Sequence, residues 1–325
     1  MKKNSDSRPE GMKTKILFAL ALLIFSFAEK SNAQFVTIPD ANFAASLQAQ
    51  FPSAMSGNQM DTTDASVVNA LVVNCQNQNI SDITGIEYFD NLQQLLCTTN
   101  NITFLPPLSN TVTSLDCSWN PAIIITSLPP ATSTFACVGC NQSSLPALPS
   151  TLGALNVSDN PALLTLPVLP ANLNLLDVTA CTSITTLVLP NNLVTLHMDT
   201  TNGILFNLPN SLAYFTCSAA NLSSLFTLPQ FLMSFDCRSN FLSCLPTLPN
   251  SLQNILAAGN SITCLPNIPT MLSSSDIGTT LCAAPTNIAT TNVSCFGGND
   301  GSITLTMGTC NAPYSFIWKI GRAHV

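Results

Sequence analysis

The feature that most constrains this chain is a repeat with a step close to twenty residues. Between Leu92 and Cys282 the pattern L-x-x-L-x-C-x-x-N-x-L recurs ten times, each time followed by a turn rich in Leu and Pro. The copies open at Leu92, Val112, Thr132, Leu152, Leu173, Leu193, Leu212, Leu232, Leu252 and Leu272, with an eroded earlier copy at Ala70. A fixed period in this range indicates a solenoid, whose turns bury their apolar faces only against one another.

Each copy is predicted to contribute one short strand to a parallel ladder. Its fourth and sixth positions are apolar, and apolar residues two apart form the inward face of a strand. The fourth positions are Leu95, Leu115, Phe135, Leu155, Leu176, Leu196, Phe215, Phe235 and Ile255, followed by Ser275 in the last copy. The ninth position is most often Asn, Cys or Thr. A short polar side chain there can bond loop backbone groups that would otherwise be buried without partners.

This pattern resembles the leucine-rich repeat family, whose consensus carries Asn, Cys or Thr at the ninth place. The segments Leu145–Pro149, Leu166–Pro170 and Leu245–Pro249 resemble the short bacterial subfamily known from type III effectors. Proline every third residue removes amide donors and fixes φ, which excludes a convex α-helix. The predicted fold is a repeat solenoid over residues 66–283, with a parallel β-ladder on its concave face and an extended, polyproline-type convex side.

Residues 1–33 are predicted to be a signal peptide. Lysines at 13 and 15 precede the apolar run 16–28, and small residues at 31 and 33 flank a cleavage site. The run is too short for an ordinary transmembrane helix. Residues 1–11 indicate either a long leading region or a true start at Met12. We therefore expect a secreted or cell-surface protein with no membrane insertion after signal cleavage.

Residues 34–65 are predicted to cap the open end of the solenoid. Phe43, Leu47 and Phe51 form an apolar helical stripe, and Asp40 is placed to cap the helix N-terminus. The run Ile38-Pro39-Asp40-Ala41-Asn42-Phe43 also resembles the entry segment of secreted leucine-rich repeat proteins from Bacteroidota. Its role is either structural capping or binding.

The charge distribution excludes two classes of partner. Between residues 34 and 318 the chain carries thirteen Asp and Glu but a single cation, Arg238. Binding of nucleic acid needs clustered Lys and Arg against phosphates, so it is not expected here. The same imbalance argues against an anionic membrane surface.

The thirteen cysteines separate by their places in the repeat. Those at the sixth position, where other copies carry Val or Met, are predicted to be small buried hydrophobes: Cys75, Cys97, Cys117, Cys137, Cys217 and Cys237. Cys140 and Cys181 occupy the ninth, loop-bonding position. Cys244 and Cys264, at equivalent convex positions, are predicted to pair. Because no CxxC pair recurs at zinc spacing, neither a metal nor a cofactor is expected.

The outward positions of the ladder are the candidate binding surface. They carry carboxylates, amides and aromatic residues, and aromatic anchors dominate many interfaces. The candidate ligand-binding residues are Asp116, Trp119, Asn156, Asp177, His197, Asp199, Tyr214, Asp236, Arg238 and Asp276. The alternative is that the acids only keep the ladder soluble.

His197 is the one candidate for chemistry, because it stands between Asp177 and Asp199 on this surface. Such a histidine suits acid–base work or metal binding. No nucleophile elbow, second histidine or cysteine nucleophile accompanies it. We therefore predict an exposed surface histidine and no enzyme.

Residues 284–318 depart from the period. Asn292–Ile303 and Pro313–Trp318 resemble the beginning of an SprB-type repeat, found in large adhesins of gliding Bacteroidota. Cys295 and Cys310 are predicted to form a disulfide within it. Residues 319–325 back-translate to a common sequencing adapter, so we expect them not to be biological. A genomic read encoding the same residues would refute this.

The resemblances together predict a surface protein that binds an extracellular protein or glycan through the concave face, most simply for adhesion. Two alternatives remain. The solenoid is either a structural spacer in a larger adhesin or the recognition part of an effector whose catalytic domain is missing.

Overall fold

The computed structural model describes residues 35–203, 207–225, 227–262, 264–278, 280–282, 287–291 and 302–306. The predicted signal peptide, the Cys295–Cys310 pair and the expected adapter segment lie outside these residues. No helix in the described part of the chain is both long and apolar enough to span a membrane.

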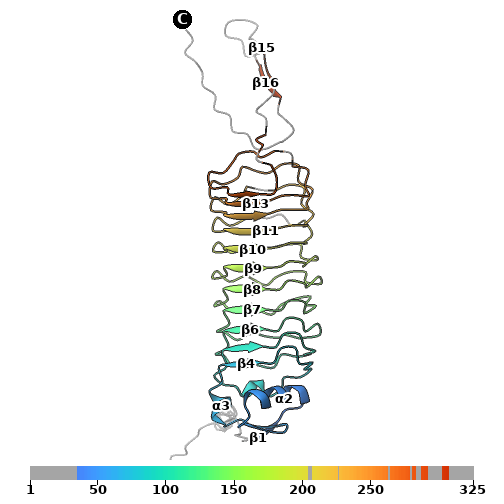
Figure 1. Ribbon diagram of the computed structural model, residues 1–325, viewed down its shortest axis with the longest axis vertical. Coiled ribbons are helices and arrows are strands. Elements are labelled where there is room, and N and C mark those ends of the chain that lie inside the picture. The colour runs from blue at the N-terminus through green and yellow to red at the C-terminus, as the bar shows by residue number, and fades with distance from the viewer. Residues whose placement is uncertain are drawn as a thin grey trace, which may run out of the picture.

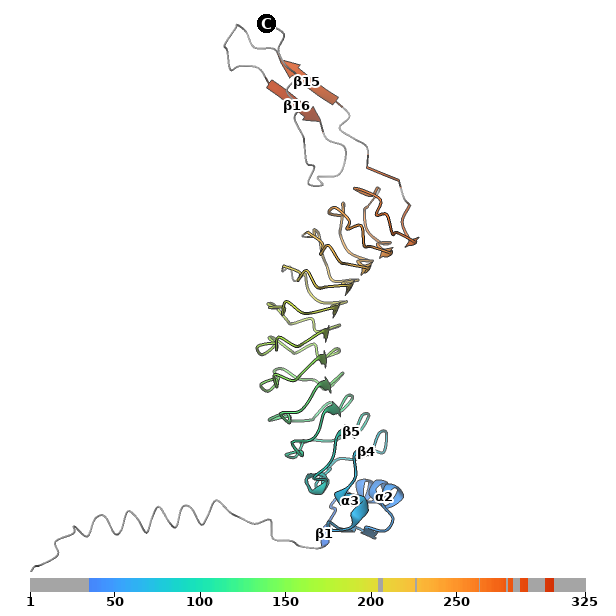
Figure 2. The same ribbon diagram turned by 90° about the vertical axis from the view of Figure 1, so that its left-hand side faces the viewer.

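The body is a curved solenoid whose turns stack into one 11-stranded parallel sheet, from β4 to β14 in chain order (Figure 1). Its strands are β4 (Val72–Asn74), β5 (Gln94–Leu96), β6 (Ser114–Asp116), β7 (Thr134–Ala136), β8 (Ala154–Asn156), β9 (Leu175–Asp177), β10 (Thr195–His197), β11 (Tyr214–Thr216), β12 (Ser234–Asp236), β13 (Asn254–Leu256) and β14 (Ser274–Ser275). They lie along the inner side of the curve (Figure 2). The predicted parallel ladder is confirmed.

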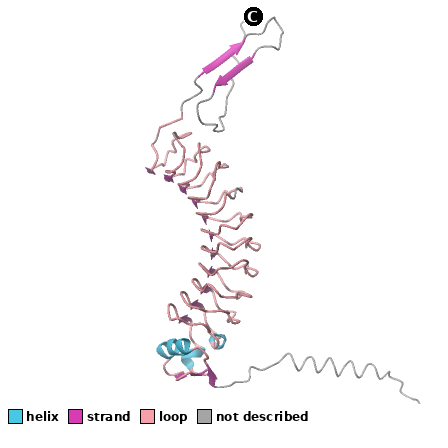
Figure 3. Cartoon of the chain, turned by 90° about the vertical axis from the view of Figure 1, so that its right-hand side faces the viewer, coloured by secondary structure: helices cyan, strands magenta, loops and turns pink. Residues whose placement is uncertain are grey.

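The opposite side of each turn is loop (Figure 3). The last helical element is the short 3-10 helix η1 (Ile86–Tyr88), so in the described residues no helix covers the repeats that follow it. The Leu-Pro segments instead end in turns, in which a proline carbonyl accepts from the amide that opens the next copy. For example, the carbonyl of Pro149 accepts from the amide of Leu152, and the carbonyl of Pro249 accepts from the amide of Leu252, both at 3.1 Å. Proline's lack of a donor excludes the helix, as the sequence predicted.

The core runs the length of the solenoid behind the strands. The fourth-position residues from Leu95 to Ile255 are all buried, and so are the sixth-position cysteines. Phe215 and Phe235 stack on neighbouring strands with ring centroids 5.5 Å apart. The two inward columns are therefore the apolar seam that holds successive turns together.

The ninth-position asparagines link successive turns by hydrogen bonds. Asn160 is fully buried, and its Nδ2 donates to the carbonyl oxygens of Cys137 and Val157, both at 2.8 Å. Its Oδ1 accepts from the amide of Gln142 in the preceding turn at 2.8 Å. Equivalent bonds are made by Asn100, Asn120, Asn240 and Asn260. The predicted role of this position is confirmed.

The eighth position adopts left-handed backbone in most copies, which the sequence did not indicate. Positive φ is found at Thr99, Trp119, Gly139, Asp159, Ala180, Thr200, Ala219, Ser239 and Gly259. This conformation costs an L-residue about 1–2 kcal/mol, yet most of these residues are not glycine. The bend it makes turns the chain from the strand into the loop and aims the ninth side chain inward.

The solenoid begins with a small capping unit. Its elements are β1 (Phe35–Thr37), α2 (Ala41–Gln50), β2 (Met55–Ser56), β3 (Gln59–Asp61) and α3 (Ala65–Val68). Phe43 and Leu47 of the predicted stripe are buried in α2, and Phe51 is buried at its C-cap. Oδ1 of Asp40 accepts from the amides of Asn42 and Phe43 at 2.9 Å. Its Oδ2 accepts from the amide and hydroxyl of Ser81 at 2.8 Å, which ties the cap to the first turn.

Replacing Asp40 with Ala should destabilise the cap by about 1–3 kcal/mol, since it removes a helix cap and the link to Ser81.

Burial alone would raise the pKa of Asp40, but hydrogen bonds from Ser81, Phe43 and Asn42 lower it. Its stabilising effect should therefore be complete above the unfolded pKa of about 4 and be lost as the pH falls through the lower folded value. Urea titrations at several pH values test this. An unchanged acid transition in Asp40→Asn would contradict it.

The far end of the solenoid holds a disulfide that the sequence did not predict. Cys264 bonds to Cys282, with an S–S distance of 2.11 Å and a Cα–Cα distance of 4.8 Å. A parallel bridge between Leu265 and Leu281 places the two cysteines side by side. The Cys264–Cys282 bond was not among the pairs that the sequence predicted, and the Cys244–Cys264 pair stays a prediction.

Beyond the repeats, β15 (Asn287–Thr291) and β16 (Ser302–Thr306) form an antiparallel hairpin that pairs Asn287 with Thr306.

Candidate functional site

The outward face of the sheet brings half of the predicted binding residues into one column. Direct ladder partners are Asp116 and Ala136, Ala136 and Asn156, Asn156 and Asp177, and Asp177 and His197. On the far side of His197 the column continues through Thr216 to Asp236. Strand neighbours lie about 4.8 Å apart, so adjacent side chains of this column can engage one ligand together.

One oxygen of each carboxylate or amide in this column accepts hydrogen bonds that stabilise the fold. Oδ1 of Asp116 accepts from the amide of Ser118 at 3.1 Å and from its hydroxyl at 2.6 Å. Asn156 makes the same pair of bonds to Ser158, at 3.0 and 2.8 Å. These contacts hold the bend that follows each strand. The sequence prediction treated binding and solubility as the alternatives for these acids and missed this third role.

His197 is joined to Asp199 through a threonine. The hydroxyl of Thr216 donates to Oδ2 of Asp199 at 2.8 Å, and its oxygen lies 3.1 Å from Nδ1 of His197. Because that hydroxyl proton is directed at Asp199, the oxygen accepts from Nδ1–H. Nε2 of the neutral ring is then the nitrogen that can accept from a ligand.

Two other predicted residues neutralise each other. The guanidinium of Arg238 binds both carboxylate oxygens of Asp236, the shortest contact being 2.6 Å. Hydrogen bonding and the charge of Asp236 raise the pKa of Arg238 above its ordinary value. The one cation of the repeats is therefore paired, and it offers a polyanion less attraction than a free arginine would.

Asp276 and Tyr214 stand apart from the hydrogen-bonded column. Asp276 follows β14 and accepts from the amides of Ala257 and Ala258 at 2.6 and 3.1 Å, which caps the end of the ladder. Tyr214 lies on β11 between Thr195 and Ser234 and is about half exposed. The structure thus gives Asp276 a structural role and leaves the Tyr214 ring accessible.

A shallow hollow of about 310 Å³ lies in the outward face at the N-terminal half of the sheet. Its floor is made by small residues, Ala136 and Ala154, where other copies carry larger ones. Gln94, Leu96, Asp116, Asn156 and Leu175 are among the residues that surround it. The sequence did not reveal the hollow, because the depression depends on the neighbours in the adjacent turns.

Trp119 lies in the bend that follows β6, three residues beyond Asp116, which is one of the residues around the hollow. Its side chain is 52% exposed, and its φ of 59° is unusual for a bulky residue. A Cβ added to Gly139 would meet the Trp119 ring at 2.5 Å, so the ring rests against the next turn where that turn has no side chain. The indole is thereby held in place with much of its surface accessible.

Comparisons with known proteins find matches for two parts of the chain. Residues 287–322 match the SprB repeat family, a match that runs past the predicted module end at Trp318. Over 77 residues the chain is 39% identical to Internalin J of Listeria monocytogenes serotype 4b (strain F2365). That alignment covers 22% of this chain and 8% of Internalin J, so the chain spans a small part of that relative.

Solved structures share the solenoid. The functional domain of InlJ from Listeria monocytogenes, which includes a cysteine ladder, gives a TM-score of 0.57 at 22% identity and covers 78% of this chain and 64% of its own. YopM, a leucine-rich effector protein from Yersinia pestis, gives 0.52 at 22% identity, with 84% and 80% covered. YopM from Yersinia enterocolitica WA-314 gives 0.51 at 27% identity, with 61% and 44% covered. These likenesses show the fold.

Proposed function

Since this chain carries a leucine-rich repeat solenoid followed by an SprB repeat, we propose that it is a secreted or cell-surface binding protein. Its ligand is an extracellular protein or glycan, held on the outward face of the sheet between β5 and β9. Binding, and not catalysis, is the function that this fold supports best. Adhesion is the simplest use of such binding beside an adhesin-type repeat.

The observation that carries the proposal is the exposed Trp119 ring, which follows β6 three residues after Asp116, a residue that lines the hollow. An indole fixed by its own backbone and by Gly139 loses little conformational entropy on binding, which is the property of an interface anchor. A flat sugar ring or an apolar protein side chain can stack on it. Asp116 and Asn156 line the hollow and supply polar contacts to the same ligand.

The negative charge of the outward face limits which classes of ligand it can bind. Asp116, Asp177 and Asp199 lie on it, while Arg238 is paired with Asp236. A neutral glycan or a neutral to basic protein surface is compatible with this charge, whereas a polyanion is repelled.

Two other uses of the solenoid remain as alternatives. A spacer needs no ligand, and the structural hydrogen bonds of the column acids fit that use. An effector role rests on the likeness to YopM, but the SprB repeat favours a surface location.

Replacing Trp119 with Ala should weaken capture of the purified protein by its natural surface roughly 30-fold, the loss of about 2 kcal/mol that defines an interface hot spot. Binding to glycan-bearing and protein-bearing surfaces, each with and without prior periodate or protease treatment, is the measurement. Val168→Ala is the matched control, because Val168 is 92% exposed in a Leu-Pro segment on the loop side. Equal capture by both variants would support the spacer instead.

A second variant removes charge while keeping the backbone hydrogen bonds to the bend that follows each strand. Asn in place of Asp116, Asp177 and Asp236 keeps the Oδ1 acceptor, as native Asn156 shows. Capture should fall while the unfolding midpoint stays within a few degrees of the parent. If capture is unchanged, the column acids serve only the fold and its solubility.

A further inference from the structure

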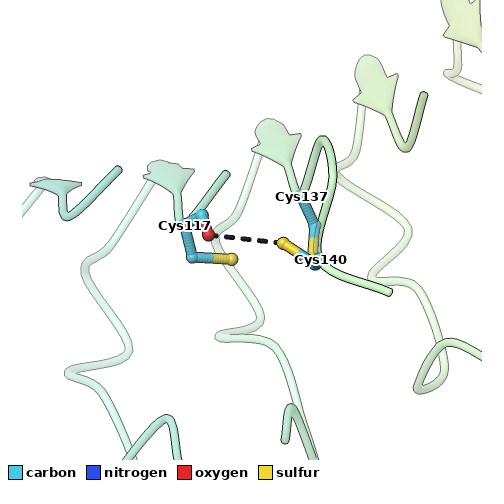
Figure 4. A group of neighbouring side chains, drawn as sticks. All are labelled: Cys117, Cys137 and Cys140. Carbon is cyan, nitrogen blue, oxygen red and sulfur yellow. Dashed lines mark hydrogen bonds between the residues drawn. The ribbon is translucent and has the colours of Figure 1, made fainter. Parts of the chain in front are cut away.

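Three buried cysteines gather between two neighbouring turns behind β6 and β7 (Figure 4). Their Sγ atoms all lie within 4.8 Å of one another, and none of the three side chains is exposed. Cys117 and Cys137 are sixth-position residues of successive copies, whereas Cys140 occupies a ninth position. It is the only such cluster among the described residues. The binding site proposed above uses none of these sulfurs.

The place of Cys140 sets this cluster apart from the rest of the cysteine column. Half of the copies carry at that position an amide that bonds both turns, but Cys140 offers a thiol that donates to the Cys117 carbonyl at 3.3 Å. Cys181 takes the same position and donates to the Val157 carbonyl at 3.1 Å. Its sixth-position neighbours, however, are Val157 and Val178. Cys140 is therefore the ninth-position thiol that meets two further sulfurs.

The protonation of the cluster is uneven. Hydrogen bonds from Cys117 and Cys137 lower the pKa of Cys140 below that of an ordinary thiol. Hydrogen bonding with Cys137 and Cys140, together with burial, raises the pKa of Cys117. The pKa of Cys137 is also raised, because the lowering effect of its hydrogen bond with Cys117 is outweighed by its hydrogen bond with Cys140 and by burial.

We propose that Cys117, Cys137 and Cys140 form a buried site for a thiophilic monovalent cation, Cu(I). Three sulfurs with no hard oxygen or imidazole ligand select a soft ion. A structural zinc site needs four ligands, and the cluster offers three. Burying charge in this apolar interior is costly, which favours a monovalent ion over a divalent one.

The dimensions suit three-coordinate binding after a small contraction. Metal–sulfur bonds of about 2.3 Å around a trigonal centre place the sulfurs about 4 Å apart. The present separations exceed this by less than an ångström at most. Binding replaces the Cys140 proton, which passes to solvent, so the step changes no oxidation state. Complete burial would then protect the ion from oxidation.

The test is a Cu(I) titration of the reduced full chain without oxygen, with the ion supplied from a bicinchoninate complex whose colour reports its release. The parent protein should remove Cu(I) from the indicator, and its thermal midpoint should rise. Cys140→Asn should lose one tightly held ion per chain, and Cys181→Asn should retain it. Asn restores the residue found at this position in other copies, so Cys140→Asn is expected to fold, as circular dichroism can verify.

Several results would overturn the site. Equal copper content in the two variants would place the ion elsewhere in the cysteine column. Binding of Zn(II) with no binding of Cu(I) would refute the three-coordinate assignment. A thiol count on the unreduced protein showing that Cys140 is oxidised to a disulfide would replace metal binding with a covalent bond.

Discussion

Replacing Asn160 with Ala is expected to destabilise the solenoid by about 2–4 kcal/mol, because each buried polar group left without a partner costs about 1–3 kcal/mol. The amide is fully buried and serves two turns at once. Its loss leaves the amide of Gln142 and the carbonyl of Cys137 without their bonds at 2.8 Å. Urea unfolding followed by circular dichroism measures the change.

The chain itself supplies the control for this prediction. At the equivalent position Thr201 donates its hydroxyl to the Met198 carbonyl at 2.8 Å. Asn160→Thr should therefore retain one of the lost bonds and recover part of the stability. If the Ala variant lost less than about 0.5 kcal/mol, water would have to enter the site and replace the amide.

The features that could be predicted are those encoded by residue type at a fixed period. The inward column from Leu95 to Ile255 and the ninth-position amides each repeat a side chain whose chemistry requires burial or backbone bonding. Stacking identical turns then leaves one arrangement, the parallel ladder that the structure shows. The cap was predictable for a similar reason, since Asp40 stands directly before an apolar helical stripe.

The features that escaped prediction depend on contacts between turns. Residues with left-handed backbone at the eighth position include Thr, Trp, Asp, Ala and Ser, so no residue type marks that conformation. The hollow over Ala136 and the support of Trp119 by Gly139 both arise from the next turn along. The Cys264–Cys282 bond likewise depends on how the final turn returns to its neighbour.

The candidate binding site and the fold draw on the same side chains. Oδ1 of Asp116 and of Asp177 accepts from the amide two residues on, which holds the bend after the strand. Their Oδ2 atoms accept no hydrogen bond among the described residues and are the part left for a ligand. Substituting Ala at these positions would remove both the hydrogen bond to the bend and the contact to a ligand. Asn keeps the first and removes the charge available to the second.

The stacked phenyl rings of Phe215 and Phe235 show why a single inward residue can matter to many turns. In a solenoid each turn is stabilised mainly by contacts with its two neighbours and makes few contacts with more distant turns. The rings lie nearly parallel, with 13° between their planes, and Phe235 is fully buried between β11 and β13. Loss of the Phe235 ring would break the apolar packing that joins the central turns to the disulfide-bearing end of the solenoid.

Phe235→Ala should cost about 3–5 kcal/mol, the usual loss for removing a buried aromatic ring and leaving a cavity. Hydrogen exchange should speed up from Ser234 to Ser275, while β5 to β9 keep their protection, because the coupling between turns is local. Phe235→Leu is the matched control, since Leu155 and Leu196 fill the same position in other turns, and it should cost less than about 1.5 kcal/mol. Uniform loss of protection along the whole sheet would show instead that the solenoid unfolds as one cooperative unit.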